Sequence, residues 1–269
     1  MPDYCIPLSP QWWKKRKKRK EQRAMKDAFF GPNVPVFADW KSACEAADGY
    51  DTDVIFQKVL ASAQAVRDGQ ALWERDSFLF YHEEYNIPLV ASLMTVAAWN
   101  GGRLNLLDFG GALGSTYMQH RNILDKLDHV DWNIVEQLHF VETGKKEFAG
   151  EYLHFWTSMQ ECFASNPVNA ILFSSVLQYM ENPYALIAEA CALKPQAIII
   201  DRTPFSNESE KIIVQHVPES IYKASYPCRL LVLQQVREAL AQDYHCMPVY
   251  PSQVDPAGFY GFMAVRKNL

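Results

Sequence analysis

The stretch Asn105-Leu-Leu-Asp-Phe-Gly-Gly-Ala-Leu-Gly-Ser115 decides the fold of this chain of 269 residues. The apolar run Leu104–Phe109 ends in a glycine-dense turn, and the helix-compatible stretch Ser115–Leu127 follows the turn. In a parallel α/β sheet, such a strand–turn–helix places a ligand over its first loop. Gly110 lets the backbone turn sharply, and Gly114 leaves no side chain between the loop and a bound ligand.

The sequence on the carboxyl side of this turn repeats the alternation of strand and helix. Strands are predicted at Leu104–Phe109, Trp132–Val135, Tyr152–Trp156, Ala170–Ser174 and Ala197–Asp201, and helices near 115–127, 137–148, 159–164 and 182–193. A loop at 202–228, a helix near Leu230–Ala241 and the two runs Tyr244–Tyr250 and Phe259–Arg266 complete the chain. The last two runs suit an antiparallel hairpin. The pattern predicts a Rossmann-like α/β fold whose sheet has five parallel strands plus this C-terminal hairpin.

Three regions are predicted along the chain. Residues 1–36 are basic and then rich in Pro and Gly, and they indicate a tail and linker. Residues 37–100 carry apolar residues at helical spacing and predict an N-terminal helical cap on the α/β domain of residues 101–269. Within the cap, Trp73–Phe80 is dense in charge, and we interpret it as a helix–helix connection with a local ion pair.

The charges of the chain are distributed unevenly. Residues 14–20 are all Lys or Arg, which leaves 19 basic against 31 acidic residues in the rest of the chain. An acidic body without a basic stripe argues against a nucleic-acid partner. Trp12 and Trp13 precede the basic run. The run is a solvated tail, a peripheral contact of residues 12–20 with the inner face of an anionic membrane, or a nuclear-import signal.

The six cysteines are scattered and form no C-x-x-C pair, which favours reduced thiols in a cytoplasmic protein and neither disulfides nor a metal site. No apolar run reaches the length of a membrane span.

The glycine turn distinguishes between two kinds of nucleotide ligand. A dinucleotide-binding G-x-G-x-x-G pattern needs a glycine at 112 or at 113, and the chain has Ala112 and Leu113. This disfavours a nicotinamide-linked oxidoreductase without excluding it. The pattern Asp-x-Gly-x-x-x-Gly from Asp108 to Gly114 resembles motif I of class I S-adenosylmethionine (SAM)-dependent methyltransferases.

Glu136 ends the second predicted strand, where a carboxylate can accept hydrogen bonds from both ribose hydroxyls of a nucleoside. Asp108 is placed to reach the amino end of SAM. Many related methyltransferases carry an acidic residue just after the third strand, which binds the adenine amino group. Here Thr157, Ser158 and Met159 follow that strand, so adenine recognition would fall to hydroxyls, backbone groups or apolar packing. The loop after the fourth strand lies beside the methyl group in methyltransferases. The predicted cofactor site comprises Asp108, Gly110, Gly111, Gly114, Glu136, Gln137, Thr157, Ser158, Ser174 and Ser175.

Further segments resemble a family of SAM-dependent methyltransferases found mainly in bacteria and often encoded beside surface-polysaccharide or lipopolysaccharide genes. The matching segments include Glu74–Ser77, Leu107–Ser115, Trp132–Gln137, Ile200–Pro204, Gln215–Pro218 and Ala224–Pro227. The resemblance implies a seven-stranded methyltransferase sheet, SAM as methyl donor with S-adenosylhomocysteine as product, and a carbohydrate or glycoconjugate acceptor. The predicted substrate-binding residues are Arg75, Asp76, Arg202, Gln215, Tyr222 and Tyr226.

The predicted activity is methyl transfer to an oxygen of a small or carbohydrate acceptor. Asp201 and His216 are the candidate bases, and Tyr179 is expected to orient the acceptor. A catalytically inert SAM-fold module in a membrane-associated assembly stays open as an alternative, and so does the NAD(P)-linked oxidoreductase.

Overall fold

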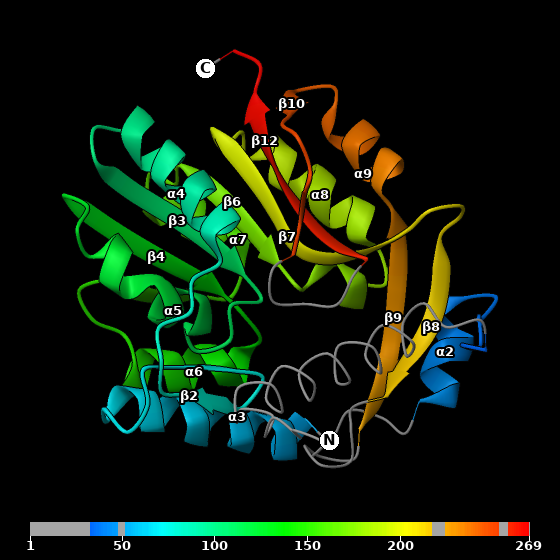
Figure 1. Cartoon of the computed structure of the whole chain (residues 1–269), viewed down its shortest axis with the longest axis horizontal. Coiled ribbons are helices and arrows are strands. Elements are labelled where there is room, and N and C mark those ends of the chain that lie inside the picture. Colours follow the sequence, from blue (N-terminus) through cyan, green and yellow to red (C-terminus); the bar gives the residue numbers. More distant parts are fainter. Residues whose placement is uncertain (1–32, 48–51, 217–223, 253–257, 269) are drawn as a thin grey trace, which may run out of the picture.

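The computed structural model describes residues 33–47, 52–216, 224–252 and 258–268, and its centre is one twisted sheet (Figure 1). Seven strands follow the order β10-β12-β7-β6-β3-β4-β5. Five of them run parallel: β3 (Arg103–Phe109), β4 (His129–Val135), β5 (Leu153–Trp156), β6 (Ala170–Ser174) and β7 (Ala197–Ser206). The strand β12 (Phe259–Arg266) lies antiparallel between β7 and β10 (Tyr244–Cys246), and β11 (Tyr250–Pro251) also pairs with β12. This confirms the predicted Rossmann-like, seven-stranded class I methyltransferase arrangement.

Helices cover both faces of the sheet because its central strands are apolar on both sides. Along β3, Leu106 packs with helices α3 (Thr52–Arg67), α4 (Ile87–Trp99), α5 (Ser115–Leu124) and α6 (Leu138–Glu147). The next residue, Leu107, packs with α7 (Met159–Ser165), α8 (Pro183–Ala192) and α9 (Leu233–Leu240) on the opposite face. The α4 helix is part of this layered core and packs directly on β3 and β7.

The segment predicted as a helix–helix connection is a β-hairpin. Strands β1 (Trp73–Arg75) and β2 (Phe78–Phe80) pair antiparallel, and the residues of the tight turn, Asp76 and Ser77, have positive φ angles of 50° and 68°. The Trp73 ring is buried and stacks on Phe80 with ring centroids 3.8 Å apart. The bulky apolar residues that flank the charges are therefore strand positions, and the hairpin lies against α5.

The prediction of a loop at 202–228 is wrong for residues 202–216 and 224–228, the part of this range that the structure describes. The β7 strand continues to Ser206, and β8 (Lys211–His216) pairs antiparallel with β9 (Ser225–Val232). Because β9 also pairs with the end of β7, this β8–β9 ribbon extends the sheet beyond its carboxyl edge. In Figure 1 the ribbon lies at the right, with α2 (Trp40–Ala46) outside it.

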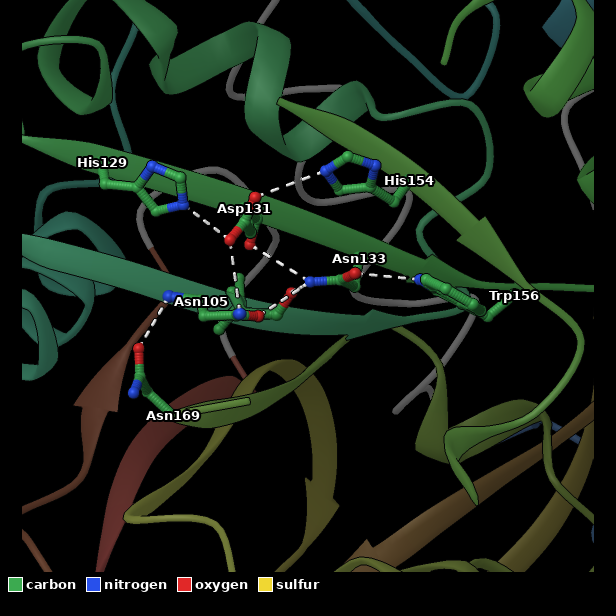
Figure 2. Close-up of polar contacts among 8 residues, drawn as sticks. Asn105, His129, Asp131, Asn133, His154, Trp156 and Asn169 are labelled. Carbon is green, nitrogen blue, oxygen red and sulfur yellow. Dashed lines mark hydrogen bonds and ion pairs between the residues drawn. The ribbon is translucent and has the colours of Figure 1, made fainter. Parts of the chain in front are cut away.

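A polar network ties β3, β4 and β5 together within the sheet (Figure 2). The amide of buried Asn133 donates to Asn105 Oδ1 at 2.9 Å and accepts from Trp156 Nε1 at 2.9 Å. Nearer the amino end of β4, Asp131 contacts His129 Nε2 at 2.7 Å. Buried amides without partners would be costly, so these bonds favour one register for the strands that carry the site.

Candidate functional site

A cavity of about 850 Å³ opens at the carboxyl ends of the parallel strands. Its size lies within the range of small-molecule sites, and this edge of an open α/β sheet is the usual place for a ligand. The loop after β3, the ends of β4, β5 and β6, the β1–β2 hairpin and the β8–β9 ribbon all contribute to its wall. Predicted cofactor residues on the wall are Asp108, Gly110, Gly111, Glu136, Gln137, Thr157, Ser158, Ser174 and Ser175.

The glycine loop makes the sharp backbone turn that the sequence predicts at Gly110. Gly110 has a φ of +72°, and a Cβ on Gly111 would lie 2.6 Å from Oδ2 of Asp108. The role expected for Gly114 differs from the structure. Gly114 precedes α5 with a φ of +99°, and its Cα faces Leu153, which a Cβ would meet at 3.2 Å. It allows strand-to-helix packing beneath the loop and does not belong to the cavity wall.

Asp108 is a buried carboxyl group under the glycine loop. It is 1% exposed, and its Oδ2 accepts a hydrogen bond from Trp132 Nε1 at 3.0 Å. Burial raises the pKa of Asp108 to about 7, which exceeds the lowering effect of the Trp132 bond, while the nearby Glu136 and Asp201 raise it slightly more. The site therefore contains a carboxyl group that a bound cation would help to ionise.

Glu136 stands at the end of β4, as predicted. Its Oε2 accepts from the Gln137 backbone N–H at 2.8 Å, and the Ala112 N–H also donates to the carboxylate. Burial raises the pKa of Glu136 in spite of these two bonds. The carboxylate is thus held by backbone groups on the cavity wall, in the position that suits a pair of ribose hydroxyls.

The wall near β5 is more apolar than its sequence indicates. The Thr157 hydroxyl donates to Glu161 Oε2 at 2.7 Å, and Ser158 Oγ accepts from the Glu161 N–H at 3.1 Å. Both hydroxyls therefore form hydrogen bonds to Glu161 in the first turn of α7. Phe140 and the buried Met159 line the cavity nearby. No sequence signal points to Phe140, because an apolar residue of an amphipathic helix is most often core.

Asp201 lies behind the cavity and connects to it through Ser174. The carboxylate is fully buried, and its Oδ2 accepts from Asn86 Nδ2 at 3.0 Å and from Ser174 Oγ at 3.1 Å. Asp201 lines a smaller chamber of about 30 Å³, and Ser174 lines both spaces. Ser174 thus donates its hydroxyl hydrogen to Asp201 while its oxygen lone pairs remain on the cavity side.

His120 is a second buried titratable group beside the smaller chamber. Its Nε2 accepts from the Asn86 backbone N–H at 3.0 Å, so Nδ1 carries the hydrogen and donates to the Thr116 carbonyl at 2.7 Å. Burial lowers the pKa of His120 to about 4. His120 is therefore neutral near pH 7 and orients Asn86, which in turn holds Asp201.

The opposite wall contains aromatic and amide groups. Tyr179, in the short helix η1 (Leu177–Tyr179), donates its hydroxyl to Gln215 Oε1 at 3.0 Å, and its ring meets Tyr226 edge-on at 5.2 Å. Burial holds the pKa of Tyr179 well above its usual value. The phenol therefore stays protonated and fixes Gln215. His216 is exposed at the end of β8 and is not on the cavity wall. Tyr222 lies outside the described residues.

The β1–β2 hairpin brings four consecutive residues to the cavity, Glu74 to Ser77. Glu74 is buried, and its Oε1 accepts a hydrogen bond from Ser115 Oγ on α5. Its other oxygen, Oε2, accepts from Ser62 Oγ on α3 and from the Ser77 backbone N–H, both at 3.4 Å. Burial raises the pKa of Glu74. Asp76 and Arg202 both line the cavity, with Oδ2 and Nη2 3.9 Å apart.

In the described part of the chain, no group of three or more His, Cys, Asp or Glu side chains is placed to hold a metal ion. Within the same ranges, none of the helices combines the length and apolar character that crossing a bilayer requires.

The strand order and the site at its carboxyl edge define the fold as that of class I methyltransferases. Among solved structures, the chain is similar to Burkholderia thailandensis 1,6-didemethyltoxoflavin-N1-methyltransferase, with 15% identity, 88% of this chain and 93% of that chain covered, and a TM-score of 0.46. For the amino pentose methyltransferase CalS10 from Micromonospora echinaspora, the identity is 9%, the coverage 76% and 96%, and the TM-score 0.46.

The magnesium protoporphyrin IX methyltransferase from Synechocystis PCC 6803 gives 14% identity, 82% and 99% coverage and a TM-score of 0.44. No protein-family model and no curated protein sequence matches the chain. The assignment of the fold therefore rests on the strand order of this chain and not on these similarities.

Proposed function

We propose that this protein is a SAM-dependent methyltransferase that transfers the methyl group to an oxygen of a small or carbohydrate-type acceptor and releases S-adenosylhomocysteine. One observation carries the proposal. The glycine turn at Gly110 and Gly111 and the carboxylate of Glu136 line the same cavity, at the carboxyl ends of adjacent strands. A nucleoside bound there has its ribose at Glu136 and its amino-acid end over the glycine loop, towards Asp108.

The charge of the cavity favours a sulfonium cofactor over a dinucleotide. Its acidic lining residues are Glu74, Asp76, Asp108, Glu136 and Glu189, and its cationic lining residues are Arg75 and Arg202. The sulfonium of SAM is a cation, which acidic groups stabilise, whereas the pyrophosphate of NAD(P) is an anion that the same groups repel.

Catalysis in this proposal depends mainly on alignment. Methyl transfer is a displacement at the sulfonium carbon, and holding two reactants in near-attack geometry supplies roughly 7–11 kcal/mol of the barrier. The acceptor would lie between Ser174 and the wall formed by Tyr179, Gln215 and Tyr226. Aromatic rings with a fixed amide provide the combination of apolar faces and hydrogen bonds that a sugar or small ring requires.

Ser174 provides a path for the acceptor proton. Its oxygen accepts a hydrogen bond from the acceptor hydroxyl while its own hydrogen points to Asp201 Oδ2, 3.1 Å away. As the oxygen–methyl bond forms and the carbon–sulfur bond breaks, the acceptor proton moves to Ser174 Oγ and the serine proton moves to Asp201. Asp201 thus acts through Ser174, and His216 has no role on the cavity wall.

Isothermal titration with SAM tests the first step. We expect the wild type to bind SAM and two site variants to bind it at least about tenfold more weakly. Glu136→Ala removes one charge-assisted contact, and Gly110→Arg places a long side chain in the glycine turn of the cavity wall. Gly150→Arg and Glu142→Ala are the matched controls, because Gly150 has open space around its Cα and Glu142 is exposed on α6. Unchanged binding in both site variants would refute the assignment.

A second candidate is an inert SAM-fold interaction module. The observation that favours it is that His216, one of the two predicted bases, is not on the cavity wall. This candidate predicts binding of SAM or S-adenosylhomocysteine without turnover. Mass spectrometry of extracts from a deletion strain distinguishes the two, because only a methyltransferase leaves a molecule lighter by one CH₂ group. Membrane recruitment through residues 12–20 concerns residues outside those described.

A further inference from the structure

The amino-acid end of SAM carries a carboxylate as well as an ammonium group, and a carboxylate in a partly buried site needs a cationic partner. Two arginines, Arg75 and Arg202, are the cationic residues among the described lining of the cavity. Both also line the smaller chamber of about 30 Å³, which shares Ser115, Thr116 and Ser174 with the wall of the cavity. A space of this size admits a group as small as a carboxylate.

The two arginines lie on different walls. Arg75 belongs to β1, which packs on α5 directly after the glycine loop. Arg202 belongs to β7, which pairs with the β8–β9 ribbon. Its Nη2 forms an ion pair with Asp76 Oδ2 at 3.9 Å. The amino-acid end of a nucleoside held at Glu136 passes over the glycine loop, so it approaches the wall that carries Arg75.

The Arg75 side chain is held in place by contacts within the protein. Its Nη2 donates to Gln119 Oε1 at 2.7 Å, and the guanidinium lies 5.0 Å from the Trp73 ring centroid. The Gln119 amide is itself fixed, because its Nε2 donates to the Glu84 carbonyl at 2.7 Å. Glu74 anchors the same strand to α5 through Ser115. Because these contacts already order the guanidinium, its binding of a carboxylate would cost little further side-chain entropy.

We infer that Arg75 binds the α-carboxylate of the cofactor, with that carboxylate placed at the mouth of the smaller chamber. The inference rests on the proposed function and deepens it. It assigns Arg75, which the sequence analysis places among the substrate-binding residues, to recognition of the methyl donor. It also gives the β1–β2 hairpin, which lies outside the seven-stranded sheet, a role in distinguishing SAM from nucleosides that lack the amino-acid carboxylate.

Titration of the full chain with SAM and with decarboxylated SAM, which lacks only this carboxylate, tests the inference. We expect the wild type to bind SAM roughly 10- to 100-fold more tightly than decarboxylated SAM, the range of a charge-assisted hydrogen-bonded pair. Arg75→Met is expected to lose this preference by weakening SAM alone. Its binding of decarboxylated SAM, within about threefold of wild type, reports that the variant is folded. Arg202→Met is the matched control and keeps the preference.

Three results would overturn the inference alone: equal binding of both ligands by the wild type, equal weakening of both in Arg75→Met, or loss of the preference in Arg202→Met instead. Binding of neither ligand by the wild type would refute the proposed function itself.

Discussion

Replacing Asp108 with asparagine should stabilise the protein in the absence of a ligand, by an amount that depends on pH. Burial raises the pKa of Asp108 from 3.8 to about 7, and the side chain is 1% exposed, so solvent does not screen it. A shift of about 3 units corresponds to roughly 4 kcal/mol, at about 1.4 kcal/mol per unit. Because the folded-state pKa is the higher one, the wild type is relatively most stable below pH 3.8 and loses this stability as pH rises to about 7.

The asparagine of the Asp108→Asn variant would not titrate, and its amide oxygen could still accept from Trp132, which lies 3.0 Å from the carboxylate in the wild type. The gain of Asp108→Asn should therefore grow by about 1.4 kcal/mol per pH unit between about pH 4 and 7 and level off above pH 7. Urea unfolding of both proteins at pH 5, 6, 7 and 8 measures this difference. Glu142→Gln, at an exposed position of α6, is the control and should stay within about 0.5 kcal/mol of wild type.

A gain that does not vary between pH 5 and 8 would refute the reasoning, because Asp108 would then not change its charge in this range. SAM should stabilise the wild type more than Asp108→Asn, since only the wild type offers a carboxylate to the cationic ligand. Stabilisation without a ligand together with weaker binding separates a functional role from damage to the fold.

Four further substitutions test the site and its support. Ser174→Ala and Asp201→Asn should each lower kcat by about 10²–10⁴-fold with little change in the Kd for SAM, measured by turnover and titration; an unchanged kcat in both would exclude the proton path. Gly144→Ala should destabilise the fold by about 1–3 kcal/mol in urea unfolding, because its Cβ would lie 2.4 Å from the Phe155 ring; a neutral effect would show that the ring can move. Ala112→Gly should raise stability by about 1 kcal/mol, because Ala112 has a φ of +49°; a loss would mean that packing of the methyl group outweighs the strain.

The parallel sheet could be predicted from sequence because its strands are buried on both faces. Such strands are continuous apolar runs, and the predicted run Ala170–Ser174 matches β6 at both ends. The β8–β9 ribbon could not be predicted in the same way. Its strands mix apolar and polar residues, and they are held by pairing with each other and with the end of β7. The β7–β9 pairing is a contact distant in sequence.

The functional site also combines local features that the sequence predicts with contacts between distant residues that it does not. Glu136 and the glycine turn are local features of a strand end, and they lie on the cavity wall as the sequence predicts. The environment of Glu74 is not local. Three charges in succession read as a surface segment, whereas Glu74 is buried against Ser115, which is 41 positions away in the chain. Contacts of that kind depend on tertiary packing, which no short window of sequence contains.

The backbone itself marks the cavity as a functional site. Described non-glycine residues with positive φ are Asp76, Ser77, Ala112, Ser175, Lys194 and Arg202, and all except Lys194 line the cavity. A non-glycine residue in this region costs about 1–2 kcal/mol, so folding alone would favour its replacement or relaxation. Accidental strain would be spread over many turns of the chain. Its concentration around one space, beside buried acids whose ionised forms are also unfavourable, indicates a geometry maintained for a ligand and not for the stability of the fold.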